Sequence, residues 1–71
     1  MQRFGEKLRT LRKRRGMTMR GLAKALGFAT HGYIGDLESG RAKPSLELAL
    51  KIADFFNVSV DQLARDELEL D

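Results

Sequence analysis

Five short stretches of helical apolar periodicity run along the chain. A glycine or asparagine follows each of the first four, and a serine or threonine then precedes the next. The first of these stretches is formed by Met1, Phe4, Leu8 and Leu11. Spacings of three and four residues predict an amphipathic helix over residues 2–15. Gly16 follows a basic last turn, which is a typical helix end. Because no stretch alternates with the period of a strand, the chain is predicted to be all-α.

The same signals predict the second and third helices. Thr18 is the expected N-cap of the second helix, and Gly27 ends it. Thr30 is the expected N-cap of the third, which runs to about Ser39 and is ended by Gly40. The residues predicted to face inward are Leu22, Ala23 and Leu26 in the second helix, and Ile34 and Leu37 in the third.

A fourth and a fifth helix complete the predicted architecture. Ser45 caps the fourth helix, residues 46–56, and Asn57 can take the left-handed conformation at its end. Ser59 and Gln62 have the spacing of a capping box for the fifth helix. The fourth helix is apolar on two stripes, formed by Leu46, Ala49, Ala53 and Phe56 and by Leu48, Ile52 and Phe55. We therefore expect it to be central to the core.

The length of 71 residues predicts one small domain, with residues 66–71 as an acidic C-terminal tail. The chain has no cysteine, which excludes disulfides and thiolate metal sites, so aliphatic packing must supply its stability. No apolar run approaches the length of a membrane span, and the N-terminus lacks the apolar stretch of a secretory signal. We expect a soluble, cytoplasmic protein.

Charge is distributed unevenly along the chain. Residues 1–43 carry eleven Lys or Arg and three Asp or Glu, whereas residues 44–71 carry two basic and seven acidic residues. Such asymmetry suggests an anionic partner on one side of the domain. Charge alone leaves a solvated basic helix without a partner equally open.

Residues 4–64 contain four motifs in a recognisable order: LRTLRKRRGMT, LAKALGF, YIGDLESGRAKPS and VSVDQL. Together they resemble the helix-turn-helix domains of the lambda-repressor, Cro and Xre family, close to that family's spacing. The resemblance implies a compact five-helix fold, which agrees with the periodicity. It also implies that the second and third helices form a DNA-binding unit, with the third helix entering the major groove.

The chain departs from the family's pattern in two places. The family usually has five residues between the turn glycine and the inward isoleucine, but six separate Gly27 from Ile34. The turn is therefore predicted to be one residue longer. The glutamine that often contacts phosphate early in the second helix is replaced by Met19. We expect that contact to be lost or taken over by Arg20.

The resemblance also assigns roles to residues that match its motifs. Arg12 and Glu38 match an ion pair between the first helix and the end of the third, and we expect a structural role for both. The residues expected at DNA phosphates are Thr18, Arg20, Tyr33, Arg41 and Lys43. Ordinary solvated loop charges are the alternative for Arg41 and Lys43. Thr18 can act as a cap alone, and the two roles are compatible.

The positions that read bases in the family fall early in the third predicted helix. Here they are Thr30, His31, Gly32 and Asp36. A histidine can donate to or accept from a purine edge, whereas Asp36 can only accept, which favours cytosine N4. Asp36 also repels phosphate and can exclude wrong registers. An exposed histidine without a role is the alternative for His31.

Glycines at positions 32 and 35 each lower helix stability by about 1 kcal/mol relative to alanine. One interpretation is clearance, because a backbone without side chains can approach bases or phosphates closely. The other is structural, with Gly32 serving the longer turn and Gly35 packing against the second helix. The sequence leaves both interpretations open and favours packing for Gly35.

The leading functional hypothesis is a sequence-specific DNA-binding transcriptional regulator, such as a phage-type repressor, that acts without catalysis, a cofactor or a metal. The resemblance implies a homodimer on an inverted-repeat operator, paired through the C-terminal helices. The residues expected on the dimer face are Phe55, Val58, Val60, Leu63, Leu68 and Leu70. The alternative is a protein-interaction module, such as an antitoxin bound to a toxin or the helix-turn-helix domain of a coactivator.

Overall fold

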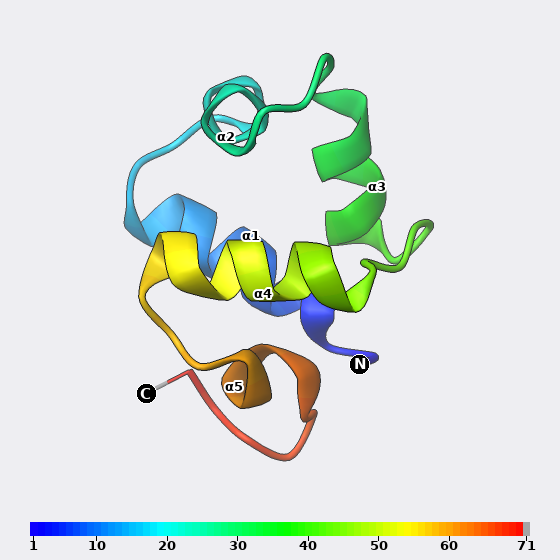
Figure 1. Ribbon diagram of the computed structural model, residues 1–71, viewed down its shortest axis with the longest axis vertical. Coiled ribbons are helices and arrows are strands. Elements are labelled where there is room, and N and C mark those ends of the chain that lie inside the picture. Colours follow the sequence, from blue (N-terminus) through cyan, green and yellow to red (C-terminus); the bar gives the residue numbers. More distant parts are fainter. Residues whose placement is uncertain (71) are drawn as a thin grey trace.

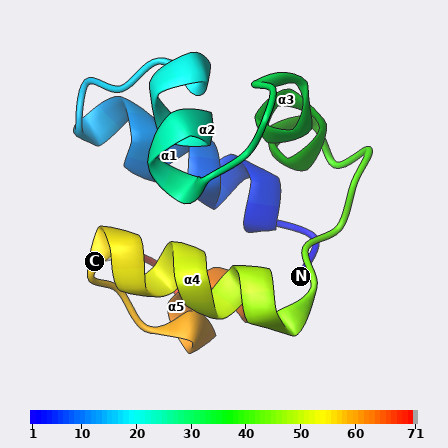
Figure 2. The ribbon, with the colours of Figure 1, turned by 45° about the horizontal axis from the view of Figure 1, so that its top comes forward.

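The computed structural model describes residues 1–70 and contains five helices within them. They are α1 (Phe4–Arg14), α2 (Met19–Leu26), α3 (Gly32–Ser39), α4 (Leu46–Phe56) and α5 (Val60–Ala64). Figure 1 shows α4 crossing in front of α1, with α3 to the right and α5 below. In the tilted view of Figure 2, α1, α2 and α3 lie above α4 and α5. The prediction of an all-α, five-helix fold is confirmed, and no strand occurs in residues 1–70.

Most helix ends follow the predicted signals. The hydroxyls of Thr18 and Ser45 each accept a backbone N–H from the first turn, at 2.9 and 3.1 Å. Ser59 and Gln62 form the complete capping box of α5. The residues in left-handed conformation after a helix are Gly16, Gly27, Gly40 and Asn57. These local hydrogen bonds fix where each helix stops and turns.

The start of α3 differs from the prediction. Its N-cap is His31 rather than Thr30, and the His31 side chain makes no capping hydrogen bond. His31 already has helical dihedrals, φ −85° and ψ −7°, and its carbonyl accepts the Gly35 N–H at 3.3 Å. The additional turn residue is thus taken up ahead of the helix, which moves Thr30 out of the capping position. The first turn of α3 consequently has no side-chain cap.

All five helices contribute to one apolar core. Its buried members are Phe4, Leu8, Leu11, Leu22, Ala23, Leu26, Ile34, Leu37, Ala49, Ile52, Ala53, Phe56 and Leu63. Two residues expected to face inward do not belong to it: Met1 is 48% exposed and Leu46 is 70% exposed. Met1 precedes α1, and Leu46 is the first residue of α4, so both lie at the edge of the core.

α1 and α3 cross in direct contact at Gly5. A Cβ atom at position 5 would lie 2.4 Å from the Leu37 carbonyl oxygen and 2.5 Å from that of Glu38. No side chain fits there unless the backbones move apart. Further along the same crossing, Arg12 Nε donates to Glu38 Oε2 at 2.6 Å and Nη2 donates to Oε1 at 3.1 Å. This hydrogen-bonded partner raises the pKa of Arg12, and both side chains are buried.

Residues 65–70 fold back on α1 rather than extending away from the domain. The Asp66 carboxylate accepts the backbone N–H groups of Gln2 and Arg3, at 3.1 and 2.9 Å, and so caps the start of α1. In return, the ammonium of Lys7, which is 1% exposed, donates to three backbone carbonyls, one within α5 and two in the chain that follows it. These are the carbonyls of Gln62, Arg65 and Leu68, at 2.5, 2.8 and 2.6 Å.

A bidentate ion pair adds to this terminal clasp, by which we mean Arg3, Lys7, Asp66 and Glu69. Arg3 Nη1 and Nη2 each lie 3.1 Å from a carboxylate oxygen of Glu69. The backbone N–H of Arg3 lowers the pKa of Asp66, and the Arg3 guanidinium lowers the pKa of Glu69. The clasp is therefore strongest when both carboxyl groups are ionised.

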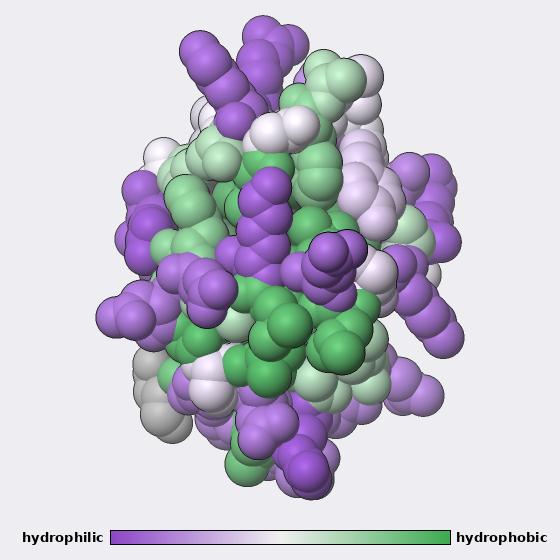
Figure 3. Space-filling model, in the orientation of Figure 1, coloured by the Kyte–Doolittle hydropathy of each residue, from purple (hydrophilic) through white to green (hydrophobic). Residues whose placement is uncertain are grey.

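The predicted dimer face is mostly engaged in the domain's own packing. Leu63 is fully buried in the core and has to be removed from that face. The half-buried residues that pack against the core are Phe55, Val58, Val60 and Leu70. Leu68 is 38% exposed. The exposed apolar pair of α4 is instead Leu46 with Leu50, and the face that α4 presents in Figure 1 carries a green apolar patch in Figure 3.

Candidate nucleic-acid interface

α2, residues 27–31 and α3 form a helix-turn-helix unit on one side of the core. Residues 27–31 leave α2 through the left-handed Gly27 and reach α3 at His31. The Phe28 ring packs edge-on against Tyr33, with centroids 5.1 Å apart and planes at 72°. Tyr33 is half-buried by this contact. The aromatic pair holds the longer turn against the first residues of α3.

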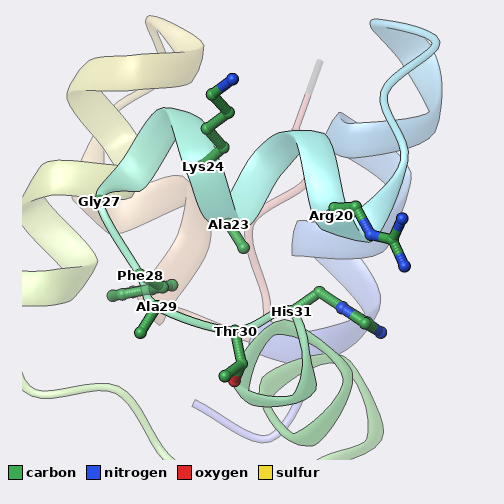
Figure 4. A pocket seen from close by; sticks show the side chains of 8 residues that line it. All are labelled: Arg20, Ala23, Lys24, Gly27, Phe28, Ala29, Thr30 and His31. Atoms are coloured by element: carbon green, nitrogen blue, oxygen red, sulfur yellow. The ribbon is translucent and has the colours of Figure 1, made fainter.

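A groove of about 470 Å³ lies between α2 and the turn before α3. It is lined by Arg20, Ala23, Lys24, Gly27, Phe28, Ala29, Thr30 and His31. Figure 4 shows the Arg20 and His31 side chains extending to the same side, whereas Lys24 points away from them. The fold thus brings together three of the predicted DNA-contacting residues, Arg20, Thr30 and His31.

Arg41 and Lys43 lie beyond the other end of α3. Both are exposed in the loop between α3 and α4. α3 has eight residues, which corresponds to a length of about 12 Å. Exposed cations therefore lie close to the start of α3, where Arg20 lines the groove with His31, and after its end, at Arg41 and Lys43. The helix between them is about as long as the major groove is wide, since that groove measures about 12 Å across. Cations in these places can contact the phosphates on both sides of a major groove in which α3 lies.

α3 itself carries two carboxylates and no cation. Glu38 is neutralised by Arg12. Asp36 is half-buried, and its backbone oxygen accepts the Ala42 N–H at 3.1 Å and the Ser39 hydroxyl at 3.2 Å. Asp36 forms no ion pair within residues 1–70, so it is the one unneutralised charge of α3 in the described chain. A negative charge there disfavours contact with phosphate and suits a base donor.

The two glycines of α3 are not required by the fold. Neither has a positive φ. A Cβ at Gly32 would approach no closer than 3.8 Å to the Thr30 hydroxyl, and one at Gly35 no closer than 3.8 Å to the Met19 sulfur. Both distances are ordinary van der Waals contacts, so alanine fits at either position. The longer turn and the contact with α2 therefore do not explain why glycine is used.

One cation that lines the groove, Lys24 of α2, was missed by sequence reasoning. It lies four residues after Arg20, a spacing that places the two residues one turn apart on the helix and was the signal available in the sequence. Its side chain points away from those of Arg20 and His31 (Figure 4). Thr18, by contrast, is exposed at the N-terminus of α2, where it caps the helix through the Gly21 N–H.

Comparisons with known proteins agree with this architecture. A family model described as a helix-turn-helix matches residues 8–63. The uncharacterized HTH-type transcriptional regulator YazB of Bacillus subtilis is 39% identical over 64 residues, which cover 90% of this chain and 91% of that protein. The uncharacterized HTH-type transcriptional regulator MJ0272 of Methanocaldococcus jannaschii is 40% identical over 57 residues, covering 80% of this chain and 85% of its own.

Longer relatives contain the same unit as a part. The HTH-type transcriptional activator BcrR of Enterococcus faecalis is 36% identical over 64 residues, or 90% of this chain and 31% of that protein. No solved structure gives a significant match. None of the helices in residues 1–70 is long and apolar enough to cross a bilayer. The family match, the relatives and the five-helix architecture together confirm the resemblance: the chain belongs to the lambda-repressor-like, Xre-type family of helix-turn-helix transcriptional regulators.

Proposed function

We propose that the chain acts in the cytoplasm as a sequence-specific regulator that binds an inverted-repeat operator as a homodimer, with α3 of each protomer in the major groove. One observation carries this proposal: α3 itself has no cation, but exposed cations lie near both of its ends. Arg20 lies near its start, and Arg41 and Lys43 follow its end. Cations at these positions supply affinity and register through phosphates, while the helix between them meets the base edges.

The proposed contacts divide into two classes. Phosphate contacts come from the α2 N-terminus at Thr18 and from Arg20, Arg41 and Lys43, all of which are exposed. Tyr33 has a smaller share in them, because its ring packs against Phe28. Base contacts come from the start and the outer face of α3, through Thr30, His31, Gly32 and Asp36. This division predicts that few side chains discriminate between bases directly.

A homodimer needs an apolar surface that the protomer does not bury itself. Leu46 and Leu50, one turn apart on α4, are 70% and 44% exposed and offer such a surface. They take the place of Leu63 in the proposed dimer face. Apolar side chains exposed as neighbours are typical of a protein contact.

Selection of bound duplexes from a random DNA pool tests the proposal. We expect an enriched palindrome with half-site centres one helical turn apart, about 34–36 Å. Affinity for the selected site should fall with salt by a log–log slope of about −0.9 for each neutralised phosphate. Lack of enrichment at low salt, or affinity that does not change with salt, would contradict the proposal.

A second candidate function is binding of another protein, such as a toxin or an effector domain, through the same exposed pair of α4. Sedimentation of the wild type and of a Leu50→Glu variant separates the two. A dimer that dissociates in the variant, with weaker operator binding, supports the homodimer. A wild type that remains monomeric on its operator favours the second candidate, because Leu46 and Leu50 are then uncovered.

A further inference from the structure

α2 starts against the middle of α3, and the contact is made by a methionine. Met19 is the first residue of α2 and packs, half-buried, against the edge of the core. Its sulfur is the nearest atom outside the helix to the place where a Gly35 side chain would begin, at 3.8 Å. The space beside Gly35 is thus bounded on the α2 side by a polarizable apolar group.

Apart from the neighbouring residues and the helix's own backbone, the Met19 sulfur is the one atom of residues 1–70 within 4 Å of that place. An alanine would fit at Gly35 with ordinary van der Waals contact, and the backbone there does not require glycine. Each glycine in a helix lowers its stability by about 1 kcal/mol relative to alanine. A recess that the fold neither needs nor fills, on the helix proposed to face bases, is suited to a small apolar group of the partner.

The major groove of DNA displays one such group. The 5-methyl of thymine projects into it and is recognised by apolar contact, without a hydrogen bond. Asp36 follows Gly35 directly and offers only acceptors, so it suits a cytosine or adenine amino group next to the methyl. A glutamine at position 19 would present an amide to this recess, whereas Met19 presents none.

We infer that Met19 and Gly35 form a recess that receives the 5-methyl group of one thymine in each operator half-site. Met19 is then a specificity-determining residue for thymine over cytosine and over uracil. The inference rests on the proposed function, because it requires α3 to lie in the major groove. It gives α2 a direct role in base recognition, through an apolar contact that the polar side chains of α3 cannot make.

Replacing each thymine of the selected operator by deoxyuridine, one position at a time, tests the inference because only the methyl group is removed. For the wild type we expect one position in each half-site at which uracil weakens binding about three- to fivefold, as for burial of one methyl group. Met19→Leu should keep this loss. Met19→Gln should bind thymine and uracil operators equally at that position.

Gly35→Ala provides a second variant that is expected to fold, because its methyl group fits beside Met19. It fills the recess, so it should lose the preference for thymine while its melting temperature stays the same or rises. Ala25→Gln is the matched control, because it adds an amide at an exposed position of α2 and should keep the preference.

The outcomes separate the two levels of inference. Specific operator binding without any uracil-sensitive position, or with equal sensitivity in wild type and Met19→Gln, overturns the thymine recess and leaves the proposed function standing. Failure of the wild type to select any duplex overturns both.

Discussion

Arg12 of α1 and Glu38 of α3, 26 residues apart in the chain, form a buried ion pair with two hydrogen bonds of 2.6 and 3.1 Å. Arg12 Nη1 also donates to the Met17 carbonyl at 2.9 Å, so the guanidinium joins α1, the following loop and α3. Glu38 occupies the last turn of α3. The position of the helix proposed to read DNA is therefore fixed by an ion pair that itself lies away from the proposed DNA surface.

Glu38→Ala should unfold at a much lower temperature than the wild type. Removing the carboxylate leaves the buried guanidinium without its partner, and breaking a buried pair in this way typically costs about 3–5 kcal/mol. Urea or thermal denaturation measures the loss. Glu47→Ala, at an exposed position of α4, is the control and should change stability by less than about 0.5 kcal/mol. An unchanged Glu38→Ala midpoint would show that the pair does not stabilise the fold.

Gly5→Ala should destabilise the protein, although alanine is the better helix former. Its Cβ would meet backbone oxygens at 2.4 and 2.5 Å, which cannot rotate away as a side chain could. Overpacking of this kind typically costs about 1–3 kcal/mol. The same substitution at Gly35, where the nearest atom is 3.8 Å away, should raise stability by up to about 1 kcal/mol. Equal effects of the two substitutions in denaturation curves would contradict this account of the crossing.

The terminal clasp should weaken in acid. Hydrogen bonds to Arg3 lower the pKa values of Asp66 and Glu69 from their ordinary 3.8 and 4.5, so the folded state favours the ionised forms. Their contribution to stability is complete above the ordinary pKa values and is lost as the pH falls below them.

Asp66→Asn isolates this effect. The variant should be less stable than the wild type at pH 7, and the difference should shrink as the pH falls from about 5 to 3. Urea denaturation at several pH values measures it, and Asp61→Asn, with an exposed and longer ion pair of 3.7 Å, is the control. A difference between Asp66→Asn and wild type that stays constant over this range would argue against the ionised carboxylate as its source.

Two substitutions near α3 should have different signatures in DNA binding. Arg41→Ala should weaken binding to all sequences alike and reduce the salt slope by about 0.9, because it removes a proposed phosphate contact. His31→Ala should relax the preference at one base pair by about 1–3 kcal/mol and leave the slope unchanged. Binding measured at several salt concentrations with matched and mismatched operators separates them. If His31→Ala keeps every base preference, the histidine is not a reader.

Features encoded within a few residues were predictable from the sequence. The hydroxyl caps at Thr18, Ser45 and Ser59 act over three residues, and the left-handed ends depend on a single glycine or asparagine. Thr30 was assigned wrongly because it has the right residue type but is one place too early. The competing requirement, the register of Ile34 in the core, decides where α3 begins.

Contacts between distant parts of the chain were not predictable in the same way. Lys7 donates to carbonyls 55 to 61 residues away, and the residues around Lys7 do not indicate where those carbonyls lie. The sequence did indicate that Lys7 is buried, because it lies three residues after Phe4 and four before Leu11, on the apolar stripe of α1. Gly5 likewise lies seven residues before Arg12, and two helical turns place both on the side that meets α3.

The close crossing at Gly5 also bears on how the protein and its DNA adapt to one another. The close approach of the two backbones and the Arg12–Glu38 pair resist tilting or sliding of α3 against α1. With α3 in the major groove, as proposed, a helix held in this way adjusts little to variations in groove width. The double helix then has to deform instead, so operators should be ranked by how much energy the base steps outside the direct contacts need to bend.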